Sequence, residues 1–177
     1  MLAITRAVPV SLARCELTHL ERVPIDVARA ARQHEHYEAA LAALGVEVVR
    51  LPATDELPDS VFVEDAAVVV DEVAVLARPG APSRRAEVPS VAAALAPYRD
   101  LLAIAAPGTL DGGDVLRIGR QLFVGLSART NAAGVAQLAA HLAPHGYRVE
   151  GIELSGCLHL KSAVTAIDAA TIVLNPD

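Results

Sequence analysis

The chain has 177 residues, of which 53% are hydrophobic and only 3% aromatic, and its formal net charge is −6. A chain of this length can form one domain with an aliphatic core, and an acidic balance without a basic run argues against a nucleic-acid-binding surface. Two isolated cysteines, with neither a signal-peptide pattern nor an apolar run of about 20 residues, predict a cytoplasmic protein that makes no membrane contact.

The first predicted helix runs from about Asp26 to Leu44, and Gly45 is placed to end it. Residues of its expected buried stripe recur three to four positions apart, which is the spacing of one helix face. The stripe consists of Val27, Ala30, Ala31, His34, Leu41 and Leu44. The apolar segment VEVVRL then predicts a strand.

Two further helices are expected later in the chain. One begins near Pro89, because proline suits a first helical position. The other begins after Thr130 or Asn131, either of which can cap exposed amides, and ends by Gly146. Each is followed by a short apolar strand, LLAIAA or YRVEGIEL.

Three hairpins are predicted, near residues 61–77, 110–126 and 158–174. Their turns, at positions 71–72, 119–120 and 168–169, follow one another at steps of 48 and 49 residues. The repeating unit is therefore strand, strand, helix, strand, a period typical of modular folds. The third unit stops after its hairpin, and the N-terminal unit has no hairpin. We therefore expect unpaired strand edges. Through these edges the chain could associate with a second copy or with a missing C-terminal segment.

The same step aligns unusual polar residues. The stretch TLDGGDVL places Asp111 and Asp114 around two glycines inside an apolar run. Forty-eight residues before these glycines lie Glu64 and Asp65, and 48 residues after Asp111 lies His159. If the units are arranged around an axis, these points converge, so the sequence predicts one site.

Five blocks resemble the dimethylarginine dimethylaminohydrolase family: LPDSVFVEDAAVV, RPGAPSRR, TLDGGDVL, FVGLSARTN and LHLKS. The resemblance covers almost the whole chain and implies the pentein fold, a five-fold pseudo-symmetric α/β propeller. Residues 1–177 would be a single incomplete domain of it, with three to four of the five modules. The implied activity is hydrolysis of dimethylarginine to citrulline and dimethylamine, without a cofactor and with a guanidinium amino acid as the small-molecule partner.

The resemblance also implies roles for single residues. His159 matches the catalytic histidine, and Asp111 matches the carboxylate that orients it. Substrate contacts are implied for Asp59, Glu64 and Asp65 at the guanidinium, for Arg84 and Arg129 at the α-carboxylate, and for Leu17 in an N-terminal lid. Arg85 stays an alternative to Arg84.

The family's nucleophile is a cysteine near the C-terminus, in a segment that residues 1–177 do not contain. Cys157, two residues before His159, stands where relatives tend to have a small residue, so we do not assign it this role. In such chemistry a thiolate attacks a guanidinium carbon that carboxylates hold in place. His159 would protonate the departing amine and then activate the water that hydrolyses the thiouronium. Residues 1–177 alone are expected to be inactive.

Three alternatives remain at this point. LDGGD-type segments also occur in arginine and agmatine deiminases, which leaves dimethylated, monomethylated and unmodified arginine open as substrates. The chain could instead be a non-catalytic module that binds a guanidinium without a nucleophile. The weakest hypothesis is a metal site of Glu64, Asp111, Asp114 and His159, and no metal is expected.

Overall fold

The computed structural model describes residues 1–17 and 21–175. The chain divides into two compact units, residues 1–63 and 64–177, and each is described by itself. In the described part of the chain, none of the helices is both long and apolar enough to cross a bilayer.

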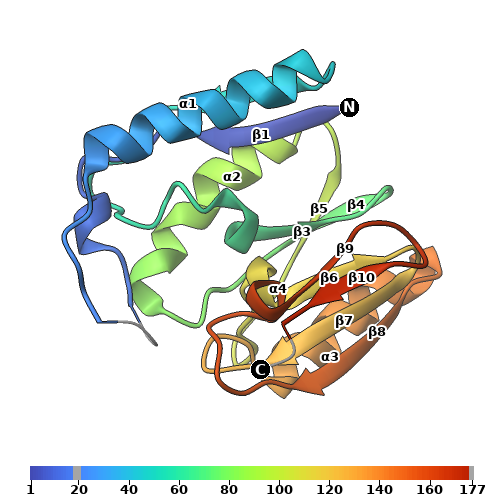
Figure 1. Ribbon diagram of the computed structural model, residues 1–177. Helices are drawn as coiled ribbons and strands as arrows, with labels where there is room; N and C mark the ends of the chain where they lie inside the picture. Colours follow the sequence, from blue (N-terminus) through green and yellow to red (C-terminus); the bar gives the residue numbers. More distant parts are fainter. Residues whose placement is uncertain (18–20, 176–177) are drawn as a thin grey trace. The chain divides into compact units, whose positions relative to one another are not determined.

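The first unit is a strand–helix–strand module (Figure 1). Strand β1 (Leu2–Arg6) pairs in parallel with β2 (Glu47–Leu51), and between them lie a short 3₁₀ helix (Leu12–Arg14) and α1 (Val27–Ala43). The Asp26 side chain accepts the N–H of Arg29 and so caps α1, while Gly45 has the positive φ (80°) that a helix end favours. The predicted helix is confirmed.

One detail of that helix differs from the expectation. The predicted stripe is half-buried at most of its positions, but Leu44 is 81% exposed. Leu44 is the C-cap, beyond the last full turn, so the stripe ends at Leu41.

The second unit holds the three predicted hairpins. The first module contains β3 (Ala67–Val69), β4 (Val73–Leu76), α2 (Val88–Leu95) and β5 (Asp100–Ala103). The second contains β6 (Val115–Ile118), β7 (Gln121–Leu126), α3 (Ala132–Leu142) and β8 (Arg148–Glu153). The third consists of α4 (Leu160–Ala163), β9 (Val164–Ala166) and β10 (Ile172–Leu174).

The first two modules repeat the same pairing. Each hairpin is antiparallel, and its second strand pairs in parallel with the strand that follows the helix. Val73 pairs with Asp100 and Gln121 with Arg148, a separation of 27 residues in both modules. Figure 1 shows β6, β7 and β8 side by side, with α3 against them. Of the third module's sheet, only the antiparallel pair β9–β10 is described.

An aliphatic core joins the first two modules. Buried side chains of β3, β4, β6, β7 and α3 pack in one cluster, and Leu110, Leu122, Val124, Leu138 and Leu142 have no measurable exposure in it. Pro89 lies in the first turn of α2, and the side chain of Asn131 caps α3 by accepting the N–H of Gly134. Both predicted helix starts are thereby confirmed.

The aligned polar residues lie in turns and not in the first hairpin strands, where we expected them. Asp65 belongs to a 3₁₀ helix (Val63–Ala66) before β3, and Asp114 ends another (Gly112–Asp114) before β6. His159 is the N-cap of α4, before β9. The N–H of Asp114 donates to the carbonyl of Asp111 and closes the turn, so TLDGGDVL becomes a strand only from Val115 onward.

Candidate functional site

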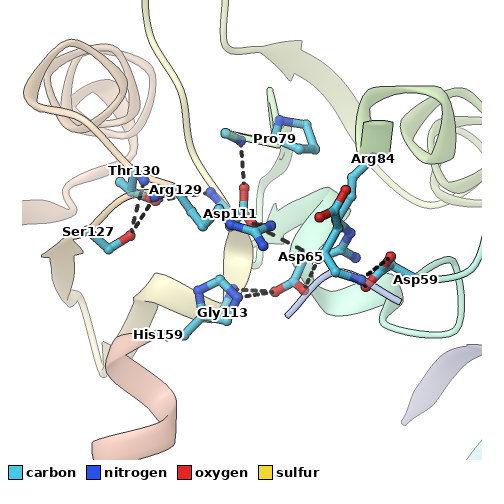
Figure 2. Close-up of polar contacts among 12 residues, drawn as sticks. Asp59, Asp65, Pro79, Arg84, Asp111, Gly113, Ser127, Arg129, Thr130 and His159 are labelled. Atoms are coloured by element: carbon cyan, nitrogen blue, oxygen red, sulfur yellow. Dashed lines mark hydrogen bonds and ion pairs between the residues drawn. The ribbon is translucent and has the colours of Figure 1, made fainter. Parts of the chain in front are cut away.

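Polar side chains of the second unit converge in its interior (Figure 2). They come from the turns that precede the three hairpins, from the 3₁₀ helix before α2 (Pro82–Glu87) and from the loop after β7. We call them the buried polar cluster: Asp65, Arg84, Glu87, Asp111, Asp114, Arg129, Thr130 and His159, each at most 9% exposed. Burial of this many charges requires that each be paired or hydrogen-bonded.

Arg84 links two of the carboxylates. Its Nη1 donates to Oδ2 of Asp65 at 2.7 Å, and its Nε and Nη2 donate to the two oxygens of Glu87 at 3.2 and 2.9 Å. The second contact is the bidentate geometry in which guanidinium–carboxylate pairs are strongest. Burial alone would lower the pKa of Arg84, but the contacts with Glu87 and Asp65 outweigh it and raise the pKa.

Asp111 is fully buried and incompletely bonded. Its Oδ1 accepts the N–H of Gly80 at 2.9 Å. Its Oδ2 has no hydrogen-bond partner among the described residues, although Nη1 of Arg129 lies at 3.6 Å and Nη1 of Arg84 at 4.0 Å. Burial, and then the charge of Asp65, raise the pKa of Asp111 above its ordinary value. This oxygen can accept a further donor.

Asp114, rather than Asp111, contacts Nδ1 of the histidine. Oδ1 of Asp114 lies 3.3 Å from Nδ1 of His159, whereas Asp111 meets backbone N–H of Gly80 and the two arginines. The family resemblance had implied Asp111 for the orienting position. The difference arises because the turn from residue 112 to 114 directs the two aspartates to different neighbours.

The opposite edge of the ring faces Asp65. Nε2 of His159 lies 3.9 Å from Oδ1 of Asp65, and that oxygen accepts the N–H of Gly113 at 2.8 Å. Burial would lower the pKa of His159, but the contact with Asp114, followed by the charges of Asp65, Asp114 and Asp111, raises it above its ordinary value. Burial likewise opposes ionisation of Asp114, yet the contacts with His159, Thr130 and Ser127 lower its pKa.

Two predicted substrate residues lie in the first unit. Asp59 is 7% exposed, and both of its carboxylate oxygens accept the N–H of Glu16 at 3.1 Å. Leu17 is 39% exposed. Their proposed contacts with a ligand stay predictions.

The second unit does not bring every predicted residue into the cluster. Glu64 points outward and pairs with Lys161, whereas Asp65 and Ala66, the next two residues of the same 3₁₀ helix, are buried. Arg85 is half-buried, and its Nε donates to the carbonyl of Pro79 at 3.0 Å. Arg84 is therefore the one of the two arginines that enters the cluster.

One grouping could hold a cation. Ligand atoms of Asp65, Asp111 and His159 lie within 4.8 Å of one another. Glu64 and Asp114, the other members of the metal hypothesis, are not part of this grouping among the described residues. Arg84 and Arg129 already stand beside the two aspartates, and their positive charges disfavour a metal ion there.

Sequence reasoning missed Glu87 and the roles of Ser127 and Thr130. The position of Glu87, three residues after Arg84, is the spacing of neighbours on a helical surface and could have signalled the pair. The hydroxyls of Ser127 and Thr130 each donate to Oδ2 of Asp114 at 2.7 Å. Nothing in the local sequence indicates these long-range contacts.

Comparisons with known proteins give a consistent result. The arginine deiminase family model matches residues 53–177. The chain is 48% identical over 172 residues to the N(G),N(G)-dimethylarginine dimethylaminohydrolase of Streptomyces coelicolor, which covers 97% of this chain and 67% of that protein. The enzyme of the same name from Pseudomonas aeruginosa is 37% identical over 145 residues, which covers 81% of this chain and 57% of the relative.

Solved structures agree. A cysteine-to-serine mutant of the Pseudomonas aeruginosa enzyme in complex with citrulline superposes with a TM-score of 0.94 at 34% identity, over 98% of this chain and 68% of that one. The N-terminal domain of a cyanobacterial arginine dihydrolase, at 18% identity and a TM-score of 0.87, shares the fold. The chain thus spans about two thirds of the length of these relatives.

Proposed function

The chain belongs to the dimethylarginine dimethylaminohydrolase family, and we propose that the protein hydrolyses the guanidino group of methylated arginine. The products are citrulline and dimethylamine, formed through a covalent cysteine thiouronium intermediate. The predicted pentein-type α/β fold is confirmed by a solved structure of the family. The observation that carries the proposal is the buried polar cluster around His159.

The charge of the cluster suits a guanidinium. It contains four carboxylates and two arginines, so negative charge exceeds positive charge when His159 is neutral. A buried excess of this kind favours a cation that brings its own hydrogen-bond donors. A planar guanidinium offers N–H groups to carboxylates in pairs, and Oδ2 of Asp111 is an acceptor whose hydrogen-bonding capacity the described residues leave unfilled.

The position of His159 suits proton transfer. Nε2 faces Asp65 and Asp111, the side on which the proposal places the guanidinium. A thiolate attacks the guanidinium carbon, and the C–N bond to the methylated nitrogen breaks while His159 gives that nitrogen a proton. His159 then accepts a proton from the water that attacks the thiouronium, the C–S bond breaks, and citrulline leaves with the thiolate restored.

The proposal places the nucleophile outside residues 1–177. Cys15 is buried in the first unit, and the thiol of Cys157 points to the main-chain oxygen of its neighbour His159 at 3.5 Å. Neither geometry resembles a thiolate aimed at a bound guanidinium. Arg129 is proposed to bind the substrate's α-carboxylate together with Arg84, and the guanidinium contact of Asp59 stays a prediction.

The test is turnover of dimethylarginine by a form of the protein that continues past Asp177, with citrulline and dimethylamine both quantified. We expect release of the two products in equal amounts, and a fall in kcat of about 100-fold or more for His159→Asn, the usual effect of removing a general acid–base. His36→Asn is the matched control because His36 is an exposed residue of α1 in the first unit, and it should leave kcat unchanged.

Substrate comparison decides between the branches of the family. Turnover of arginine or agmatine with no turnover of dimethylarginine would replace the proposed activity by a deiminase activity. Loss of product release in Cys157→Ser, with binding of dimethylarginine retained, would contradict the external nucleophile. No turnover of any guanidino compound by the longer form would contradict the proposal.

A further inference from the structure

Asp114 is a carboxylate of the cluster whose two oxygens both accept hydrogen bonds. It has no measurable exposure. Its Oδ2 accepts the hydroxyls of Ser127 and Thr130, both at 2.7 Å. Its Oδ1 accepts the main-chain N–H of Leu160 at 3.1 Å and lies 3.3 Å from Nδ1 of His159. Four groups from two distant segments thus meet on one carboxylate.

We propose that Asp114 is a positioning residue that fixes the tautomer of His159 and ties its ring to the loop that carries Arg129. The proposal rests on the proposed function only in treating His159 as the general acid–base. Asp114 acts through His159 and is not proposed to touch the substrate.

The tautomer follows from the donors around the carboxylate. Oδ1 already accepts the N–H of Leu160, and an ionised carboxylate can only accept hydrogen bonds. Nδ1 of His159 has no hydrogen-bond partner within strict geometric limits among the described residues, but 3.3 Å from this carboxylate it is favourable only as an N–H donor. The neutral ring therefore carries its proton on Nδ1 and presents the bare Nε2 to the side of Asp65. That is the nitrogen that must exchange a proton with a ligand.

The link to Arg129 runs through the two hydroxyls. The hydroxyl oxygen of Ser127 accepts the N–H groups of Arg129 and Thr130 at 3.0 and 3.2 Å. The hydroxyl of Thr130 also accepts the N–H of Asp111 at 3.1 Å. Because two short hydrogen bonds hold Asp114 to this loop, a displacement of Asp114 moves both the ring and the loop.

The charged groups that face the ring come from two turns. They are Asp65 before β3, and Asp111 and Asp114 before β6; Arg84 and Arg129 stand behind the first two. Of the three aspartates, Asp114 alone contacts Nδ1 at 3.3 Å. Asp111 affects the ring by charge without orienting it, so it supplies the matched control.

The experiment is a titration of the imidazole nitrogens by ¹⁵N NMR on the 177-residue chain, which requires no turnover. In the unsubstituted protein we expect the neutral ring to show a protonated Nδ1 and a bare Nε2. In Asp114→Asn, the amide oxygen can keep the contacts of Oδ1, so the tautomer stays, but the titration midpoint falls by about one to three pH units with the lost charge. Asp111→Asn should produce a smaller fall.

A second variant tests the link without removing the carboxylate. Ser127→Ala with Thr130→Val deletes both donors to Oδ2, and we expect a mixture of tautomers together with shifted amide signals of the loop around Arg129. A neutral ring protonated on Nε2 in the unsubstituted chain would overturn the proposal. So would a midpoint that falls at least as far in Asp111→Asn as in Asp114→Asn. If dimethylarginine were not hydrolysed by the longer form but these spectra were as expected, the proposed function would fail and this inference would stand.

Discussion

The close approach of two modules at Gly112 makes a sharp prediction for Gly112→Ala. A Cβ at this position would lie 2.0 Å from the main-chain oxygen of Glu64, a full ångström inside the 3.0 Å that real Cβ atoms respect. Backbone cannot rotate away as a side chain can, so the turns at residues 63–66 and 112–114 must separate. The hydrogen bond from the N–H of Gly113 to Asp65, 2.8 Å long, spans the same gap and would be stretched.

The cost can be worked from these contacts. A buried hydrogen bond to a charged group contributes about 1.5–3 kcal/mol, and overpacking adds about 1–3 kcal/mol. Replacing glycine by alanine also lowers the conformational entropy of the unfolded chain, which stabilises the folded state by about 0.4–1 kcal/mol. We expect a net loss of about 2–5 kcal/mol, which lowers the melting temperature by roughly 10 °C for a chain of this size.

Urea unfolding followed by far-UV circular dichroism measures this loss. Gly151→Ala is the matched control, because its Cβ would meet only side-chain carbons at 3.7 Å, an ordinary contact; it should change the free energy of unfolding by less than about 1 kcal/mol. If Gly112→Ala were as stable as Gly151→Ala, the two turns would not be in contact as described, and the geometry of the cluster would be wrong.

Three further predictions concern the same unit. In Gly113→Ala the new Cβ would lie 2.7 Å from Oδ1 of Asp65 and 2.8 Å from Cδ2 of His159; these side chains can move, so the ¹⁵N signals of His159 should shift while the unfolding free energy changes less than in Gly112→Ala. Leu138→Ala removes a fully buried side chain and should cost about 2–5 kcal/mol in urea unfolding, against no measurable cost for the exposed Leu44→Ala. The pKa of His159 is raised in the folded chain, so protonation of His159 stabilises the fold fully below the ordinary pKa of 6.5. This stabilisation is lost as the pH rises through the raised pKa. The unfolding free energy of the unsubstituted chain should therefore fall over this pH range, and that of His159→Gln should not show this fall.

The modular architecture was predictable because each repeat carries its own local signals. Turn residues at constant spacing located the hairpins, and caps such as Asp26 and Asn131 located the helix starts. In both modules the second strand of the hairpin pairs with the strand after the helix, at a constant separation of 27 residues. This pairing follows from the same regularity. Periodicity alone fixes these features, since each depends on residues within one module.

The partners of the site residues depend on contacts between modules, which local sequence does not encode. One turn of 3₁₀ helix separates Asp111 from Asp114 along the chain. The conformation of this turn decides which of the two carboxylates reaches Nδ1 of His159. A strand in this place would have sent alternate side chains to opposite faces. Glu64 was aligned with the site by its spacing, but the turn directs it outward.

The charge of the cluster has a consequence for catalysis itself. The pKa of His159 is raised because the contact with Asp114 and the charges of Asp65, Asp114 and Asp111 outweigh burial of the ring, so these aspartates favour the protonated histidine. A bound guanidinium adds a positive charge beside Asp65 and Asp111 and should lower the pKa of His159, which makes donation of its proton easier. Citrulline is neutral at the same position and should leave the pKa higher. An NMR titration of His159 with saturating dimethylarginine or citrulline, in a form that binds but cannot turn over, separates the two cases; equal midpoints with both ligands would show that the substrate's charge does not reach the ring.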